Sequence, residues 1–380
     1  MGLLLPDPSA RGSPHHRQLS AFPAARGPLI KLFSMNATES VSVQPKSKHY
    51  WKAVGPFKEI LHRTITPEQL VALSEKKPAM HLAYAARQFG MILFCSYFLF
   101  SPATPWWAVL PLIVLQGFTF FNMTTLLHEV VHSSIFKKPD PKLERVLGLL
   151  YAITSGISAS QFTKWHLDHH DGLGTDDEDP KRHWLSPKRN KRWFKALYCT
   201  PALMVIYFRA AANEVRTYPE ALKKIIARER MATILIQLSV GATLFYFGGW
   251  RAMLQVWFLP YFLVFPVAFT INRLGQHYRI DPTHPLKWAT VMMPSRIWDF
   301  LFVYSNYHAE HHYFPRVPFY NLRKLHMILK PMYVELGLKP QTYRGILWEW
   351  FVLNRAPHTN WDLAAEAVPP TTSVQPSRAA

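Results

Sequence analysis

The sequence predicts an all-α integral membrane protein with four transmembrane helices in two hairpins, interfacial helices and a cytosolic helical cap. Three observations lead to this fold class: long apolar runs, basic segments on one side of those runs, and a low fraction of charged residues. Of the 380 residues, 49% are hydrophobic and 18% are charged. Soluble domains carry about a quarter of charged residues, so the composition favours a membrane protein.

Four apolar runs approach the length of about 20 residues that a helix needs to cross the hydrocarbon layer. They lie at 89–100, 106–121, 231–247 and 252–271, and the second continues toward Leu127. Short turns at 101–105 and 248–251 join the first to the second run and the third to the fourth. The pattern therefore predicts two transmembrane hairpins.

The distribution of tryptophans and basic residues predicts how these hairpins are oriented. Trp106, Trp107 and Trp250 stand at the two outer turns, as in an aromatic belt. The basic segments 181–195 and 222–230 lie on the other side of the runs. By the positive-inside rule, both termini and the large middle region are expected to be cytoplasmic.

Two shorter apolar segments, 146–162 and 193–208, require a separate interpretation. We expect both to lie at the membrane interface, with the basic segment 181–195 on the lipid headgroups. The alternative that both segments cross the membrane stays open at this stage.

The folded part of the chain is expected to be a single membrane domain at 48–356. Residues 1–47 are rich in Ser, Ala, Arg, Pro and Gly and show little periodicity, so we predict disorder there, with Met35 as the natural start. The tail 357–380 is also predicted to be disordered.

The net charge of +19 bears on partners. No nucleic-acid recognition motif accompanies it, so anionic lipid headgroups or an acidic electron-carrier protein are the expected partners. Cys95 and Cys199, the two cysteines, lie far apart in sequence. A disulfide framework is excluded, and a reducing compartment is expected for the functional half.

Three histidine clusters carry the chemistry. They are HEVVH at 128–132, HLDHH at 166–170 and HAEHH at 308–312, and they contribute His128, His132, His166, His169, His170, His308, His311 and His312. Residues three and four apart share one face of a helix, so each cluster is expected to present its imidazoles in one direction. That arrangement is typical of metal ligands.

Eight imidazoles exceed what one metal ion binds, so the sequence predicts two metal ions. Imidazole suits Fe, Cu, Zn and Ni, and redox chemistry beside a membrane favours iron. His277 is a candidate ninth ligand. The candidates to orient the ligands from behind are Glu129, Asp168, Asp171 and Glu310. For the acidic run 175–180, positioning of the histidine clusters and docking of a partner stay open as alternatives, but we expect a solvated loop.

Two other classes of protein explain fewer of these residues. A membrane zinc peptidase would use HEVVH but leaves both HxxHH clusters unexplained. A histidine-rich metal transporter would place polar ligands within the spans, whereas these clusters fall outside them.

The three clusters, in this order and separated by apolar hairpins, resemble the histidine boxes of the membrane fatty acid desaturase/hydroxylase superfamily. The resemblance covers residues 80–335, and "HHYFPRVPFYNL" at 311–322 resembles the extension after the third box. "HLDHHDGLGTD" and "NYHAEHH" are also similar to the sphingolipid desaturase branch of that superfamily.

The resemblance implies a di-iron centre on the cytosolic side of four transmembrane helices. It adds His277 as a metal ligand and Asn272 as a residue near the second metal. The implied activity is an O2-dependent desaturase that introduces a cis double bond into a lipid acyl chain. A hydroxylase or ketolase of a fatty, sphingolipid, carotenoid or alkane chain is the alternative.

Two departures from the family's patterns refine the expectation. The third box begins with His308, where front-end desaturases carry Gln. The chain has no HPGG signature of a fused cytochrome b5. The electron donor is therefore expected to be a separate protein of the cytochrome b5 or ferredoxin type, used with a reductase.

Overall fold

The computed structural model describes residues 47–175, 177–281 and 283–358. The segment and tail that we predicted to be disordered lie outside the described residues, apart from Ser47, Pro357 and His358. His358 is buried, so the folded part extends two residues past the predicted boundary at 356. Within the described residues, the β pairing consists of one isolated bridge between Met292 and Gln341. The predicted all-α fold is confirmed for this part of the chain.

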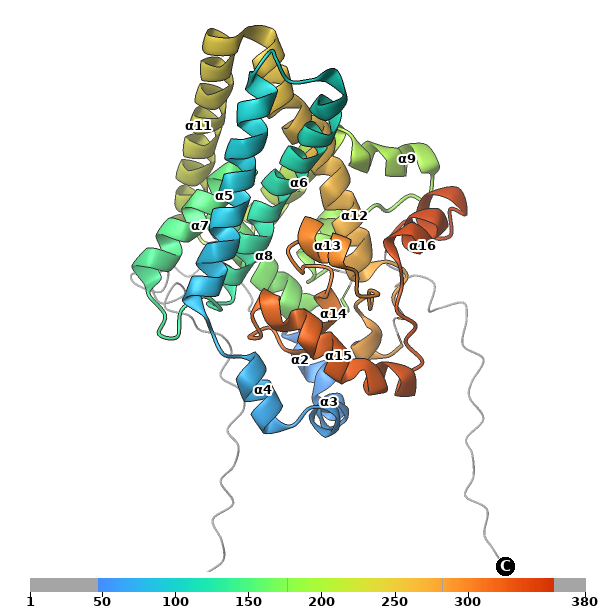
Figure 1. The fold of residues 1–380 in the computed structure, drawn as a ribbon. Coiled ribbons are helices and arrows are strands. Elements are labelled where there is room, and N and C mark those ends of the chain that lie inside the picture. Colours follow the sequence, from blue (N-terminus) through green and yellow to red (C-terminus); the bar gives the residue numbers. More distant parts are fainter. Residues whose placement is uncertain (1–46, 176, 282, 359–380) are drawn as a thin grey trace, which may run out of the picture.

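Two helical hairpins form the membrane part of the molecule (Figure 1). The first joins α5 (Pro78–Phe100) to α6 (Trp106–Val131). The second begins with α11 (Glu220–Ala252) and returns through the π-helical turns η4 (Met253–Phe258) and η5 (Pro260–Val264) into α12 (Phe265–His277). In the described chain, three helical stretches are long and apolar enough to cross a membrane: α5, α6 and the 58 residues Glu220–His277.

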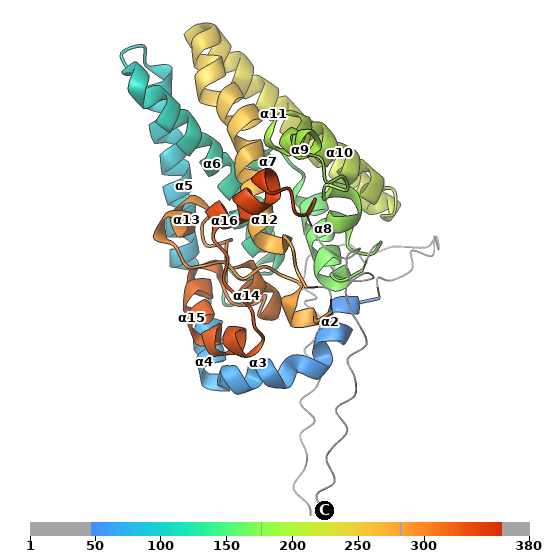
Figure 2. The same ribbon diagram turned by 90° about the vertical axis from the view of Figure 1, so that its right-hand side faces the viewer.

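The 58-residue stretch folds back on itself at Gly249, which has φ 65° and ψ −169°. A straight helix of that length would extend about 87 Å, nearly three times the hydrocarbon thickness. Glycine adopts this positive φ readily because it has no Cβ atom. The two arms lie together near this turn and diverge toward the other end of the molecule (Figure 2). The predicted turn at 248–251 is thus observed.

Arg251 links the outer turns of the two hairpins. Its guanidinium donates to the carbonyl oxygens of Leu99 and Ser101, both at 3.3 Å, and to that of Phe100. These carbonyls end α5, where the helix dipole is negative. The single charge in the turn therefore neutralises a helix end.

Both predicted interfacial segments are broken rather than continuous. The first divides into α7 (Pro141–Ser155) and α8 (Ala159–Gly172), which meet at 95° because Gly156 takes φ 77°. A Cβ atom on Gly156 would collide with the Tyr261 hydroxyl. The second divides into α9 (Arg192–Ala196), η3 (Leu197–Cys199) and α10 (Ala202–Val215). At 14 residues, α10 would extend only about 21 Å.

Short helices from both ends of the chain build the cap. Its N-terminal part contains α2 (His49–Val54), η1 (Gly55–Phe57), α3 (Lys58–Thr64) and α4 (Pro67–Leu73). Its other elements are η2 (Lys181–Leu185), η6 (Pro285–Lys287), α13 (Arg296–Leu301), α14 (His308–Tyr313), α15 (Phe319–Glu335), α16 (Tyr343–Leu347) and η7 (Trp348–Val352).

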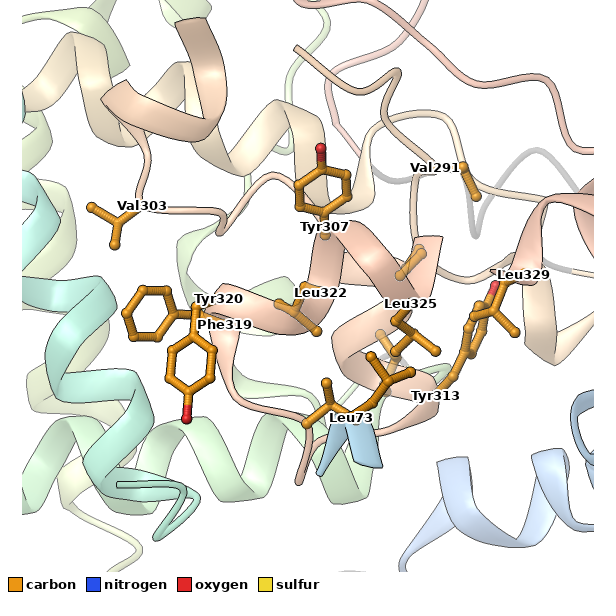
Figure 3. Close-up of a cluster of buried hydrophobic side chains, with 14 of the residues drawn as sticks. Leu73, Val291, Val303, Tyr307, Tyr313, Phe319, Tyr320, Leu322, Leu325 and Leu329 are labelled. Carbon is orange, nitrogen blue, oxygen red and sulfur yellow. The ribbon is translucent and has the colours of Figure 1, made fainter. Parts of the chain in front are cut away.

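The cap is held together by the apolar face of α15. Leu322, Leu325 and Leu329 recur every three to four residues and are at most 3% exposed. In Figure 3 they lie in one cluster with Leu73 of α4 and with Tyr313 at the end of α14. Truncating one such leucine to alanine typically costs about 2–5 kcal/mol. This packing positions α14, which carries the third histidine cluster.

Candidate metal centre

Four helices bring the nine predicted histidines together. The first cluster ends α6, the second lies on α8, His277 ends α12, and the third cluster lies on α14. They form two groups, one of His128, His132, His166, His170 and His311, and one of His169, His277, His308 and His312. Within each group the potential ligand nitrogens lie within 4.8 Å of one another.

The spacing within each cluster decides which group a histidine joins. Residues four apart stay together: His128 with His132, His166 with His170, and His308 with His312. The middle histidine of each HxxHH cluster belongs to the group that the other two histidines of its cluster do not join. His169 therefore lies with His308 and His312, and His311 lies with His166 and His170. On a helix, the i+3 and i+4 side chains are about 100° apart, so they diverge. Our expectation that each cluster presents all its imidazoles in one direction is therefore wrong.

The imidazoles face one another through Nε2 atoms. The Nε2–Nε2 distance is 2.9 Å for His132 and His166, and 3.0 Å for both His128–His311 and His308–His312. Two ligands at about 2.1 Å from one ion and at a right angle lie about 3.0 Å apart. Lone pairs at this distance repel unless a cation lies among them, so the donor set fits a metal ion.

Burial keeps these rings in the form that binds metal. It is the main cause that lowers the pKa of His308, His311 and His312 well below the usual value, and neighbouring imidazoles lower it further. The rings are therefore neutral at pH 7. A neutral imidazole carries a free lone pair, which a metal ion requires.

The Nδ1 atoms of three histidines contact groups that fix the tautomer. His169 Nδ1 donates to Asp179 Oδ1 at 2.8 Å, and His277 Nδ1 donates to the Trp288 carbonyl at 2.8 Å. His128 Nδ1 lies 3.3 Å from Glu129 Oε1. With the proton on Nδ1, the lone pair is on Nε2 and points into the group.

Lys181 contacts a fourth histidine of the groups. Its Nζ lies 3.0 Å from His166 Nδ1. Burial lowers the pKa of Lys181 to about 7, and the nearby Arg273 lowers it further, while Asp179 raises it. The lysine therefore contacts the His166 ring at Nδ1, while Nε2 of the same ring faces His132 at 2.9 Å.

The predicted supporting residues separate into different environments. Glu129 is buried beside His128 and accepts from Ser134 Oγ at 2.6 Å. The others have different partners: Asp168 pairs with Lys164, Asp171 accepts from Trp51, Glu310 accepts from His326 and Tyr333, and Asn272 bonds to Ser305 and Gln276. Glu129 is thus the predicted carboxylate with a direct contact to a grouped histidine.

Asp179 is a supporting residue that lies in the acidic run and that the sequence did not single out. The acidic run 175–180 was expected to be a solvated loop, but Asp179 is 2% exposed. Its Oδ1 also accepts from the Lys181 backbone N–H at 3.0 Å. The sequence signal was a carboxylate ten residues after His169, and only the fold of that loop brings the two together.

Replacing Asp179 by alanine is expected to lower metal affinity about 10- to 100-fold, the range typical of groups that orient a ligand. The His169 ring would lose its Nδ1 acceptor and rotate more freely. Metal retained after dialysis against a graded series of chelator concentrations measures the effect. Asp177→Ala is the matched control, because Asp177 is exposed in the same loop. Equal retention in both variants would contradict the role of Asp179.

Two neighbouring cavities lie between the histidines and the membrane part. The inner one, about 100 Å³, is lined by His128, His166, His308 and His311. The outer one, about 230 Å³, lies between α10, α11 and the returning arm. Both are lined by Thr124, Phe162, Tyr207 and Phe269. The space beside the histidine groups therefore adjoins an apolar cavity among the spans.

Comparison with known proteins supplies the family. A model of the fatty acid desaturase family matches residues 104–344. The chain is 24% identical over 242 residues to the human sphingolipid delta(4)-desaturase/C4-monooxygenase DES2, covering 60% of this chain and 68% of that protein. It is 28% identical over 273 residues to the Schizosaccharomyces pombe sphingolipid delta(4)-desaturase, covering 67% and 71%.

The family match covers more than half of the chain and contains all three histidine clusters and His277. The apolar hairpins agree with a membrane protein. The relatives are named desaturases or monooxygenases, which are oxidoreductases. The chain belongs to the membrane fatty acid desaturase/hydroxylase superfamily, as an oxidoreductase of lipids.

Proposed function

We propose that this protein is an O2-dependent di-iron desaturase that introduces a double bond into the chain of a membrane lipid. The observation that carries the proposal is the pair of histidine groups beside a cavity that adjoins an apolar cavity in the membrane part. The nine histidines would act together as the ligands of two iron ions. When bound, iron supplies the oxidation of an unactivated C–H bond with O2.

The overall reaction needs two electrons from outside the protein. Desaturation converts –CH2–CH2–, O2, two electrons and two protons into –CH=CH– and two molecules of water. Hydroxylation of one C–H bond takes the same O2, electrons and protons and yields an alcohol and one water. The relatives' names contain both desaturase and C4-monooxygenase, so hydroxylation is the second candidate. The position of the chain relative to the metals decides between them.

The apolar cavity supports a long hydrocarbon chain as the substrate. Its lining includes Leu203, Trp257 and Phe262, and the partly exposed Phe208 and Leu238 lie where it reaches the lipid-facing surface. A chain in this cavity would pass Phe162 and Tyr207 to reach the histidine groups. Apolar walls favour the chain by about 0.8 kcal/mol for each CH2 removed from water, and they exclude water from the reacting carbon.

The polar part of the inner cavity supports a substrate whose polar end lies near the reacting carbon. Lys181, Arg273 and Gln276 line it together with the histidines. The Arg273 guanidinium donates to Ser186 Oγ at 3.1 Å, which leaves other donors for a substrate oxygen. A sphingoid or acyl chain with hydroxyl, amide or ester oxygens a few carbons from the reacting bond has this chemistry.

The competing classes explain less of the site. A zinc peptidase would use only His128, Glu129 and His132, although seven further histidines complete the two groups. We place the histidine groups and both termini on the cytoplasmic side, because the basic segments 181–195 and 222–230 belong to that side. A cytoplasmic one-electron carrier with its reductase would then supply the electrons.

The test is to express the full chain with a reductase and its carrier, measure bound metal, and follow membrane lipids by mass spectrometry. A loss of two hydrogens from a lipid chain supports desaturation, and the gain of one oxygen supports hydroxylation. Unchanged lipids together with one zinc ion per chain would reject both candidates.

A cavity-filling variant tests the substrate path. Thr233 lines the outer cavity and is 4% exposed. Thr233→Phe is expected to shift conversion toward shorter chains, because the added ring occupies the space of the chain end. Thr233→Val, which keeps the size, should leave chain-length preference unchanged. The same preference in both variants would argue against this path.

A further inference from the structure

The two histidine groups face different sides of the molecule. His128, His166 and His311 of the five-histidine group line the inner cavity, whereas the four-histidine group contributes only His308 to it. On the side away from the cavity, the four-histidine group meets the N-terminal helix α2 and the loop around η6. Figure 2 shows α2 beside the lower end of α8, far from the hairpin turns. The substrate and α2 therefore approach the metal groups from different directions.

Aromatic rings lead from this side of the cap directly to the four-histidine group. The Tyr50 ring lies edge-on to the His312 ring, with centroids 5.6 Å apart. Tyr50 also contacts Trp51 at 5.2 Å and Trp288 at 6.2 Å. Trp288 stacks on His49 at 5.6 Å, with the two ring planes 10° apart. These four residues, His49, Tyr50, Trp51 and Trp288, form what we call the aromatic relay.

The relay reaches the metal ligands by two connections. Tyr50 makes a ring contact with His312, and the Trp288 carbonyl accepts the Nδ1–H of His277 at 2.8 Å. Both histidines belong to the four-histidine group. At the other end, His49 and Trp51 are only half-buried, while Tyr50 is 1% and Trp288 6% exposed. The relay thus runs from two half-buried rings near the surface, through two buried rings, to the histidines of the interior site.

Three contacts fix the position of the relay relative to the histidine groups. Ser47 Oγ donates to Glu178 and Trp51 Nε1 donates to Asp171 at 3.0 Å, which fixes α2 against the segment that follows the second cluster. Trp288 packs over Gly174, where an added Cβ atom would lie 2.2 Å from the Trp288 ring. Packing of this kind fixes the distances between the rings.

We propose that electrons enter the metal centre through this relay, from a reduced one-electron carrier protein that docks on the α2 side of the cap. The inference rests on the proposed function. In each step the carrier loses one electron and the metal of the four-histidine group gains one, and two steps supply one turnover. The rings provide a path of closely spaced π systems, and no bond of the relay is made or broken. Electron delivery is thereby kept apart from the lipid path.

The experiment uses the full chain, loaded with iron in lipid nanodiscs, and follows reduction of the metal by rapid-freeze EPR. The reductants are a soluble reduced haem b domain and, separately, dithionite. Tyr50→Leu and Trp288→Leu are expected to slow reduction by the haem protein severalfold, because each change interrupts the series of π systems between the surface and the ligands. Tyr50→Phe and Trp288→Phe, which keep a ring, should reduce at nearly the original rate.

Two comparisons separate the relay from a purely structural role. Reduction by dithionite and the iron content should stay unchanged in Tyr50→Leu. Trp348→Leu is the control, because Trp348 is 56% exposed on η7. Unchanged rates with the haem protein, or equal slowing with both reductants, would overturn the proposal. If the variants change the reduction rates as expected but the original protein forms no lipid product, the proposed function is rejected and the electron path is retained.

Discussion

Replacing His312 by alanine is expected to remove the metal of the four-histidine group and to lower lipid conversion at least about 100-fold, the upper range for changes around a metal site. His132→Ala should do the same to the five-histidine group. Each variant should retain about one metal ion per chain where the original protein binds two. Elemental analysis of the purified protein, together with lipid mass spectrometry, measures both quantities.

The separation into two groups makes this prediction specific. His312 and His132 belong to different groups, although both lie in clusters that look alike in sequence. His62→Ala is the control, because His62 is exposed on α3. Loss of both metals in either single variant would show that the groups do not bind independently. Full activity in either variant would remove that histidine from the site.

Replacing Glu229 by alanine is expected to destabilise the protein by about 3 kcal/mol, the lower end of the cost of breaking a buried ion pair, because the Arg145 side chain left behind is 33% exposed. Glu229 on α11 is 7% exposed and pairs with Arg145 of α7. It also accepts from Ser158 Oγ at 2.6 Å and from the Ser160 backbone N–H at 2.9 Å. One carboxylate thus joins α7, α11 and the first turn of α8.

Losing the Glu229 contacts should also weaken metal binding, because α8 carries the second histidine cluster. Thermal unfolding in detergent and metal retention should both decrease in Glu229→Ala. Glu229→Gln, which keeps one acceptor oxygen, should lose less. Glu220→Ala is the matched control on the same helix, because the Glu220 side chain is 74% exposed and its change should stay within about 0.5 kcal/mol. Equal stability of the Glu229→Ala and Glu220→Ala variants would contradict the anchoring role.

The hairpins could be predicted from sequence because their signal is local. A run of apolar residues long enough to cross the hydrocarbon, followed by a short turn and a second run, leaves few alternatives. The turns at 101–105 and around Gly249 are found as predicted. The breaks at Gly156 and Pro201 were not predicted, because an apolar segment with one glycine or proline is compatible with a continuous helix as well as with a bend.

The carboxylates that contact the histidines could not be predicted from the sequence. Asp179 and Glu310 are both acidic residues near a histidine cluster, yet Asp179 contacts His169 whereas Glu310 is bonded to His326 and Tyr333. Sequence distance does not decide such contacts. The path of the loop at 173–180 and the face of α14 that packs on α15 decide them.

The sequence by itself determined the class of the protein: an α-helical membrane protein with eight histidines at spacings typical of metal ligands and His277 as a ninth candidate. Helix periodicity and hydrophobic length are local properties of the chain, so they can be read without the fold. Only the tertiary structure decided which histidines share a group, which carboxylate orients them, and that a cavity and an aromatic relay reach the groups from different sides. The grouping and the relay depend on contacts between segments more than 100 residues apart, such as His128 with His311 and Tyr50 with His312, and packing of the whole chain fixes those distances. The contact of Asp179 with His169 spans only ten residues, but it depends on a local fold that the sequence does not reveal.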